Sequence, residues 1–339
     1  MRRTGNLSDQ IASRDNLRLA YVKALRGKRG KADARSFATD LEANLAQLAD
    51  DLLSGSVPVG NYRQFTIFDP KERIITAPCF RERVLHHAIM NACEPAFDQF
   101  LIADTFACRK EKGRLAAVDR TWHFAGWSAF FLKMDVRKYF ESIPHEKLVR
   151  RLCRIFKDER LLWLFERIVL AYESSPGRGL PIGALTSQHF ANFYLGFLDR
   201  FVKETLRFHG YVRYMDDFVL WQDSATDLRT AQTEVTRFLY EALELEPKSN
   251  SYINRTEHGM GFLGLRVFPD RLTLSRRSRA RFRRKLYAYE QAFCDGWLDE
   301  CSLQRRVAAL TAFTRTPNVR SWRYRRDVIE RSPVSGHRP

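Results

Sequence analysis

Hydrophobic residues recur along this chain at two different periods, and these periods divide it into helical and extended segments. In most of the sequence the apolar positions are three or four residues apart, which is typical of amphipathic helices. A glycine closes each of the first two such runs, as is common where a helix ends. The spacing predicts helices over residues 6–27, 36–55, 81–100, 145–156, 161–173, 184–208, 226–245 and 279–293, with a further helical hairpin beyond them.

Shorter segments alternate apolar and polar residues or form brief apolar runs, which indicates strands. Residues 61–78 alternate around the turn "DPKE" and predict a hairpin with a cationic loop. A strand is predicted at 129–136, a strand pair within 211–222 and further extended chain at 259–269. Strands and helices are mixed without the strand–helix–strand rhythm of a parallel sheet. The predicted fold class is therefore α+β.

Composition and charge narrow the class of protein. The 339 residues are enough for a sizeable core, and 45% hydrophobic with 13% aromatic residues excludes a disordered chain. Lys and Arg number 57 against 40 Asp and Glu, a net charge of +17, which favours a polyanionic partner. Nucleic acid, an anionic membrane surface and a basic surface without such a partner all remain open on charge alone. The first residues lack a cleavable apolar segment and no run approaches about eighteen apolar residues, so we expect a cytoplasmic protein with no membrane partner.

Cysteine and histidine do not form a recognisable metal-binding pattern. The six cysteines include no C-x-x-C pair, so neither a zinc site nor a disulfide framework is predicted, and reduced core thiols are expected. They are Cys79, Cys93, Cys108, Cys153, Cys294 and Cys301. His86 and His87 lie in a predicted helix without zinc-type spacing of other ligands. We predict that they pack or form hydrogen bonds.

Two adjacent aspartates, Asp216 and Asp217, stand between apolar strands in "RYMDDFVLW". Carboxylates so close repel each other and raise one another's pKa unless a cation neutralises them, and magnesium prefers such oxygen ligands. Asp135, which ends the strand predicted at 129–136, supplies a third carboxylate. If Asp135 and Asp216 share two ions about 4 Å apart, the site suits nucleotidyl transfer, with manganese able to replace magnesium. The alternative is a polar hairpin turn with solvated acids.

The order of the motifs resembles that of a reverse transcriptase. "FLKMDVRKYF", "GLPIGALTSQHFANFYL", "YMDD", "LELEPKS" and "GFLGLRVF" follow one another as the successive motifs of that family do, from the palm to the primer-binding strand. The resemblance covers roughly residues 15 to 300 and implies a right-hand polymerase fold. It implies an N-terminal helical extension over 1–60, fingers over 61–130, a palm over 131–268 with inserted helices at 145–180, and a basic helical thumb with a C-terminal tail over 269–339.

The resemblance assigns a role to each matching residue. Asp135, Asp216 and Asp217 correspond to the catalytic acids and metal ligands, Asp135 and Asp216 as the direct ones, with the carbonyl of Val136 assisting. The remaining matches are the substrate residues Lys71 and Arg73, which clamp the triphosphate, the sugar gate Phe140, and Lys248, a proton donor near the pyrophosphate. The alternative to a functional role is burial in the core for Phe140 and a solvated surface position for Lys71 and Lys248.

One departure from the common pattern narrows the subfamily. Many reverse transcriptases have Gln-Gly before the long helix and Ser-Pro within it, whereas this chain has Ile182-Gly183 and then Ser187-Gln188. The form "IGALTSQHFAN" resembles the reverse transcriptases of diversity-generating retroelements. Ile182 offers only an apolar surface near the nascent base pair, so discrimination between correct and incorrect nucleotides at this site should rest on shape. In that family the site is associated with error-prone copying of template adenines.

The resemblance also implies the nucleic-acid contacts and the partners. The implied contacts on template, primer or hybrid are Arg109, Lys110, Gly264, Arg276, Arg277, Arg283 and Arg284. The partners would be a template RNA, the RNA–DNA hybrid, deoxynucleoside triphosphates, and a small basic accessory protein or a second copy of the chain. Two alternatives stay open: a defence-associated reverse transcriptase that uses a noncoding RNA, and an inactive RNA-binding scaffold.

Overall fold

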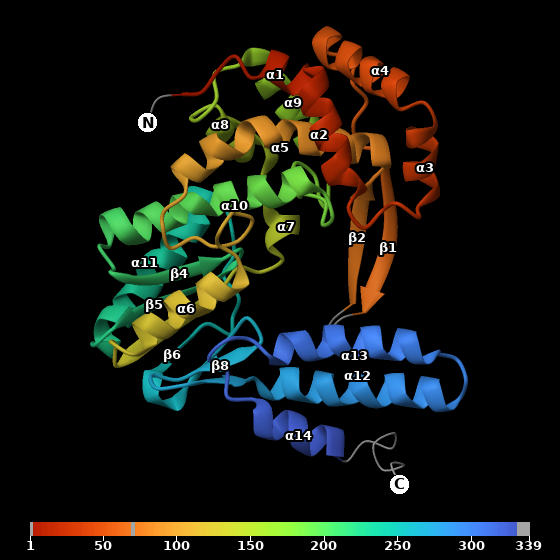
Figure 1. Ribbon diagram of the computed structural model, residues 1–339. Coiled ribbons are helices and arrows are strands. Elements are labelled where there is room, and N and C mark those ends of the chain that lie inside the picture. The colour runs from red at the N-terminus through yellow and green to blue at the C-terminus, as the bar shows by residue number, and fades with distance from the viewer. Residues whose placement is uncertain (1–2, 69–71, 331–339) are drawn as a thin grey trace.

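The computed structural model describes residues 3–68 and 72–330, in which helices and antiparallel sheets are mixed (Figure 1). The helices are α1 (Ser8–Ala12), α2 (Arg14–Leu25), α3 (Ala32–Thr39), α4 (Leu41–Ser54), α5 (Phe80–Phe100), α6 (Arg114–Ala125), α7 (Tyr139–Ser142), α8 (His145–Leu152), α9 (Glu159–Leu170), α10 (Leu185–Arg200), α11 (Ala225–Leu243), α12 (Arg276–Cys294), α13 (Glu300–Thr314) and α14 (Trp322–Glu330). The α+β prediction is confirmed. None of the described helices is both long and apolar enough to span a bilayer.

Three sheets carry the strands. They are β1 (Tyr62–Phe68), β2 (Glu72–Pro78), β3 (Phe130–Asp135), β4 (Gly210–Tyr214), β5 (Asp217–Gln222), β6 (Tyr252–Arg255), β7 (Met260–Phe262), β8 (Leu265–Val267) and β9 (Leu272–Leu274). β1 and β2 pair as a hairpin, and β7, β8 and β9 form a sheet of three strands. The central sheet has the order β4-β5-β3-β6, so the strand that ends in Asp135 lies beside the strand that begins with Asp217.

The main core lies between the central sheet and the helices that cover it. α10 is buried along most of its length and packs against α5, while α11 contacts β3 and β5 from the same sheet. Fully buried phenylalanines from α5, α9, α10 and the loop between α8 and α9 meet edge to face, with ring centroids 5.1–5.6 Å apart. These rings fix α10 against the helices behind it, and α10 in turn supports the sheet that carries the acids.

The two long N-terminal helices predicted from the periodicity are each interrupted once. Ser13 leaves the helical conformation with φ −61° and ψ 141°, and its side chain accepts a hydrogen bond from the Asn16 amide as the N-cap of α2. Asp40, with φ −130° and ψ 65°, separates α3 from α4. The apolar period continues through both breaks because the helices on either side pack on the same core, and the prediction of unbroken helices is wrong there.

Several other details differ from the prediction. The periodicity missed α6, α7, β6 and β9, which are short or have weakly periodic apolar residues. The helix predicted to run to residue 208 is α-helical only to Arg200 and continues as a π-helix at Phe201–Thr205. β9 joins β7 and β8, so this sheet crosses the predicted boundary between palm and thumb. All six cysteines are free, but Cys294 and Cys301 are exposed, which corrects the expectation that every thiol lies in the core.

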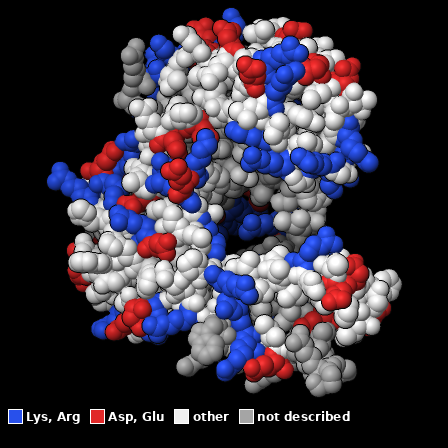
Figure 2. Space-filling view, in the orientation of Figure 1, with Lys and Arg blue, Asp and Glu red and all other residues white. Residues whose placement is uncertain are grey.

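The elements surround a deep opening. The β1–β2 hairpin points toward the α12–α13 pair, and β7 and β8 lie between that pair and the central sheet (Figure 1). Lys and Arg border the opening on the face shown in Figure 2. Part of the positive charge of the chain therefore borders a hollow between segments that are far apart in the sequence.

Candidate active site

The acids lie on two neighbouring strands of the central sheet. Asp135 ends β3 and is the register partner of Asp217, which begins β5. Asp216 stands in the tight turn between β4 and β5, after Met215, whose φ is +56°. The sheet therefore brings together three carboxylates, two of them adjacent in the chain and the third far from both.

A buried arginine that the sequence reasoning missed holds this turn. The Arg213 guanidinium is fully buried and donates to the Met215 carbonyl at 2.9 Å. It also donates to both Asp199 oxygens at 2.6 Å and to the Asn192 side-chain and main-chain oxygens at 2.9 and 3.0 Å. Opposite charges so well hydrogen-bonded keep a single geometry. The network thus fixes the backbone one residue before Asp216, with α10 as its support.

Burial and mutual repulsion make the acid pair unfavourable without a cation. Burial, followed by the charge of Asp135, raises the pKa of Asp216 to about 7. The Asp135 Oδ1 atom is buried and has no hydrogen-bond partner, an uncommon state for a carboxylate oxygen. An unpartnered oxygen beside a second, repelling carboxylate fits a divalent cation. Asp135 and Asp216, with the Val136 carbonyl next to them, are the groups that would hold it.

Asp217 has its ammonium partner on the neighbouring strand β3. Burial raises its pKa, and the nearby Lys133 ammonium opposes that rise. Lys133 Nζ lies 2.7 Å from Oδ1 and 2.8 Å from Oδ2 of Asp217. Within the described part of the chain no three or more His, Cys, Asp or Glu side chains are grouped to hold a metal ion. His86 is fully buried, with its Nε2 atom 3.6 Å from Glu82 Oε1. That His86 and His87 pack or form hydrogen bonds, and bind no metal, stays a prediction.

Lys248 lies directly beside the acid pair. Its Nζ donates to Asp135 Oδ2 at 2.5 Å, and its backbone N–H donates to the Asp135 carbonyl at 2.8 Å. The preceding residues pair with the chain after Asp135, through a bridge between Val136 and Pro247. A segment more than a hundred residues away is thereby bound to the end of β3, and its ammonium faces the Asp135 carboxylate. The predicted role of Lys248 as a proton donor to the pyrophosphate stays a prediction.

A cleft of about 1030 Å³ is lined by one of the three acids, Asp217, and by cations from separate elements, while Asp135 and Asp216 are not among its lining residues. Of the predicted residues, Arg73, Asp217, Gly264, Arg277 and Arg284 line it. Lys71 lies outside the described residues. Arg114 from the unpredicted α6 also reaches the cleft, where its guanidinium stacks 4.8 Å from the Phe313 ring.

Other predicted contact residues lie elsewhere. The Arg109 side chain is only 10% exposed, and its guanidinium donates hydrogen bonds to Asp98 and to the carbonyls of Ile102 and Thr105. Lys110 pairs with Glu94 at 2.9 Å, and both residues line a separate hollow together with Gln188. Arg276 and Arg283 are exposed on α12 but are not among the residues that line the cleft.

The segment before α10 joins the hairpin to the region after Asp135. The Thr76 amide of β2 donates to the Ile182 carbonyl at 2.8 Å, and the Leu180 amide donates to the Phe140 carbonyl at 2.7 Å. Gly183 has φ +132°, and a Cβ there would lie 2.9 Å from Ile75 and 3.0 Å from the Thr76 carbonyl, so only glycine allows this approach. Phe140 itself is half-buried against the core. Backbone hydrogen bonds therefore link the segment of Ile182 both to Phe140 and to the β1–β2 hairpin.

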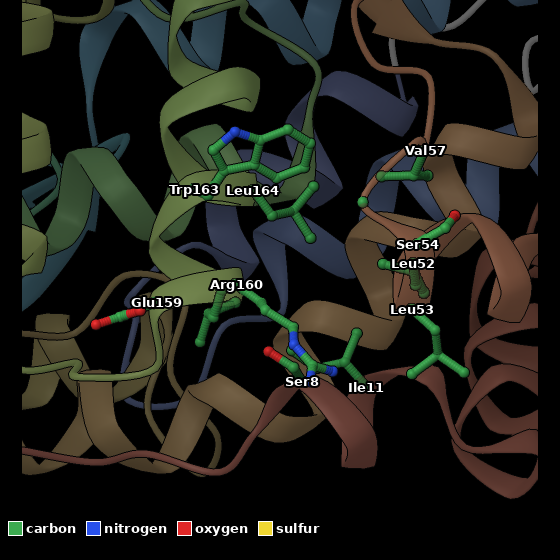
Figure 3. Close-up of a pocket in the computed structure, with 12 residues that line it drawn as sticks. Ser8, Ile11, Leu52, Leu53, Ser54, Val57, Glu159, Arg160, Trp163 and Leu164 are labelled. Carbon is green, nitrogen blue, oxygen red and sulfur yellow. The ribbon is translucent and has the colours of Figure 1, made fainter.

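A second hollow, of about 450 Å³, lies among α1, α4 and α9 (Figure 3). Ile11, Leu52, Val57, Trp163 and Leu164 give it a mainly apolar lining. It shares no lining residue with the cleft beside the acids. The carboxylates and the concentrated cations therefore identify the cleft, and not this hollow, as the candidate active site.

The raised pKa of Asp216 predicts how stability depends on pH. Ordinary aspartates titrate near about 4, so between roughly pH 4 and 7 the folded protein holds a proton that the unfolded chain has released. Stability should then fall as the pH rises through this interval. We expect the melting temperature of Asp216→Asn, measured without divalent cations, to exceed that of the wild type at pH 8 and to match it at pH 4. A constant difference between the two proteins would contradict this assignment.

Comparison with known proteins identifies the motifs as a family signature. The family model for reverse transcriptase (RNA-dependent DNA polymerase) matches residues 68–267, more than half of the chain. The COX1/OXI3 intron 1 protein of Saccharomyces cerevisiae is 22% identical over 60% of this chain and 26% of its own length. Protein YkfC of Escherichia coli is 24% identical over 49% of this chain and 48% of its own length. The chain thus spans from about a quarter to about half of the length of these relatives.

The fold is also that of a solved polymerase. Apo telomerase from Candida tropicalis superimposes with a TM-score of 0.51 over 86% of this chain and 66% of its own, at 11% sequence identity. Such low identity bears on the fold alone. It confirms the prediction of a right-hand polymerase fold, in which an antiparallel sheet carries acids beside a cleft.

Proposed function

The chain belongs to the reverse transcriptase (RNA-dependent DNA polymerase) family, and on that premise we propose that it copies a dedicated RNA into DNA by metal-dependent nucleotidyl transfer. The observation that carries the proposal is the pair Asp135 and Asp216, in which burial and mutual repulsion coexist with an unpartnered carboxylate oxygen. Template RNA, the RNA–DNA hybrid and deoxynucleoside triphosphates are the proposed partners. A small basic accessory protein or a second copy of the chain would complete the assembly.

The residues around the acids divide the work of the reaction. Two magnesium ions, when bound to Asp135, Asp216 and the Val136 carbonyl, would lower the pKa of the primer 3′-hydroxyl and neutralise the leaving pyrophosphate. Lys248, whose Nζ lies 2.5 Å from Asp135 Oδ2, is the proposed proton donor to the pyrophosphate. Arg73 on β2 reaches the cleft from the hairpin side, where a guanidinium suits bidentate binding of the triphosphate.

Phe140 is the proposed sugar gate. A ring at this position would collide with the 2′-hydroxyl of a ribonucleotide, so selection rests on shape and not on a hydrogen bond. Phe140→Ala should admit ribonucleotides and reduce the preference for deoxynucleotides by about tenfold or more, measured as the ratio of the kcat/KM values. Tyr139→Phe is the neighbouring control, because Tyr139 is buried and its hydroxyl donates to the Ala191 carbonyl of α10. An unchanged ratio in Phe140→Ala would remove the gate.

The biological role that we propose is mutagenic copying in a diversity-generating retroelement. The residues that support it are Ile182 and Gln188, which replace the more common Gln and Pro of this motif. Ile182 cannot hydrogen-bond to the nascent pair, and its carbonyl is bound to Thr76 of the β1–β2 hairpin, so its side chain sits on a fixed backbone. Mispairing at the template would then be opposed by shape alone.

Sequencing of the products tests this role. The protein, purified with its bound nucleic acid, is supplied with magnesium and four deoxynucleotides beside an Asp216→Ala control. The expected product is cDNA that the Asp216→Ala control does not make and whose errors are concentrated at template adenines. Ile182→Gln should lower the frequency of those errors about tenfold. Faithful, repetitive or untemplated DNA from one bound RNA would point instead to phage defence. If the wild type makes no product beyond that of the Asp216→Ala control, the RNA-binding scaffold is favoured.

A further inference from the structure

Lys133 contacts both an acid of the site and the small sheet that faces it. Its Nζ lies 2.7 and 2.8 Å from the two Asp217 oxygens and donates to the Gly261 carbonyl of β7 at 2.9 Å. The same ammonium stands 5.2 Å from the centroid of the Phe262 ring. Lys133 is 18% exposed and Asp217 25% exposed at their side chains, and both line the cleft.

We propose that Lys133 is a positioning residue that serves as a fixed cation for Asp217, keeping this carboxylate out of the metal-binding pair, and that it locks β7 to the catalytic sheet. The inference rests on the proposed function, because it concerns the metal and the primer of that reaction. It assigns different electrostatic tasks to the two adjacent aspartates. Asp216 and the Oδ1 atom of Asp135 share a divalent cation, while Lys248 bonds Asp135 through Oδ2 and Lys133 neutralises Asp217.

The positions of the strands explain why this device is needed. Asp135 and Asp217 are register partners on β3 and β5, so an unneutralised Asp217 would be a third carboxylate beside the pair. Lys133 precedes Asp135 by two residues on β3 and therefore projects from the same face of the strand. Asp135 Oδ1 and Asp217 Oδ1 are both buried without a hydrogen bond, but the Lys133 ammonium lies 2.7 Å from Asp217 Oδ1. Lys248 bonds Asp135 through its other oxygen, Oδ2, so Asp135 Oδ1 stays open to a cation.

The contact with β7 gives Lys133 a second effect. β7 forms an outer strand of the β7-β8-β9 sheet and lies beside the turn that contains Gly264, a predicted primer contact. Because one ammonium binds both the Gly261 carbonyl and Asp217, a shift of the primer-bearing sheet relative to the acids would break one of these bonds. Lys133 therefore fixes the distance between the primer strand and the acids.

Binding of Mn²⁺ alone, measured by calorimetry on the full chain, separates this role from a general structural one. Lys133→Met removes a positive charge beside the acids and leaves Asp217 free to join them, so we expect Mn²⁺ to bind about tenfold more tightly. The KM for an RNA–DNA hybrid should rise several-fold in the same variant, because β7 is released. Lys133→Arg keeps the charge and should retain the wild-type Mn²⁺ affinity within about twofold.

Lys203→Met is the matched control. Lys203 also binds a carboxylate and a carbonyl, Asp104 at 3.2 Å and His209 at 2.8 Å, but it does not line the cleft. The Lys203→Met substitution should lower the melting temperature without changing the Mn²⁺ affinity or the KM for the hybrid. Unchanged or weaker Mn²⁺ binding in Lys133→Met overturns the inference about Lys133. Failure of the wild type to bind Mn²⁺ at all overturns the metal site of the proposed function, and the inference falls with it.

Discussion

Replacing Asp216 by asparagine should lower DNA synthesis by about 1,000-fold or more while leaving the fold intact. Asparagine keeps the size of the side chain but removes the charge that, with Asp135, would hold the cation. A loss of roughly 4 kcal/mol of transition-state stabilisation corresponds to about three powers of ten in rate. Extension of a primed RNA template, measured with saturating magnesium and nucleotides, gives the rate directly.

The control for this substitution is an acid at the other end of the same strand. Asp223 is exposed just beyond β5 and accepts a hydrogen bond from the Ala129 amide at 2.9 Å, a bond that an asparagine carbonyl also accepts. Asp223→Asn should therefore synthesise DNA within about twofold of the wild-type rate. Asp216→Asn, in contrast, should lose activity while its metal-free melting temperature rises above that of the wild type at pH 8, because repulsion from Asp135 is relieved. More than a tenth of the wild-type rate in this variant would rule out Asp216 as a catalytic acid.

The acids could be predicted because their signal is local. Two adjacent aspartates within an apolar run and an aspartate at the end of a strand are unusual enough to be noticed in one sequence. The side chains that organise them could not. Lys133 meets Asp217 from 84 residues away and Arg213 meets Asp199 from 14, and neither pair shares a helical or strand period. An arginine two residues before the turn gives no sign in the sequence that it is buried.

Residue type and periodicity were also insufficient to sort the predicted nucleic-acid contacts. Arg109 and Arg277 both lie in basic stretches, yet one folds back on the loop before it and the other lines the cleft. The difference depends on which segments pack around them, which periodicity does not encode. The unbroken N-terminal helices failed for a related reason, since Ser13 and Asp40 break the backbone without changing the apolar period.

The arginines of α12 provide the second prediction with a large expected effect. Arg277 and Arg284 are seven residues apart, two turns of one helix face, and both line the cleft. Each is expected to bind one phosphate of the duplex. Arg277→Ala with Arg284→Ala should weaken binding of an RNA–DNA hybrid at least about tenfold and reduce the slope of log K against log salt by about two. Fluorescence anisotropy at several salt concentrations measures both quantities.

The same helix supplies the matched control, because Arg276 and Arg283 have the same charge and spacing. These two residues are exposed outside the cleft, and Arg283 lies close enough to Tyr324 of α14 to counteract the burial that raises the pKa of that tyrosine. Arg276→Ala with Arg283→Ala removes the same net charge from the protein, so long-range attraction falls equally in both double variants. Only the loss of direct phosphate contacts should then distinguish them. Equal salt slopes would show that the thumb attracts nucleic acid through its total charge and that α12 has no preferred binding face.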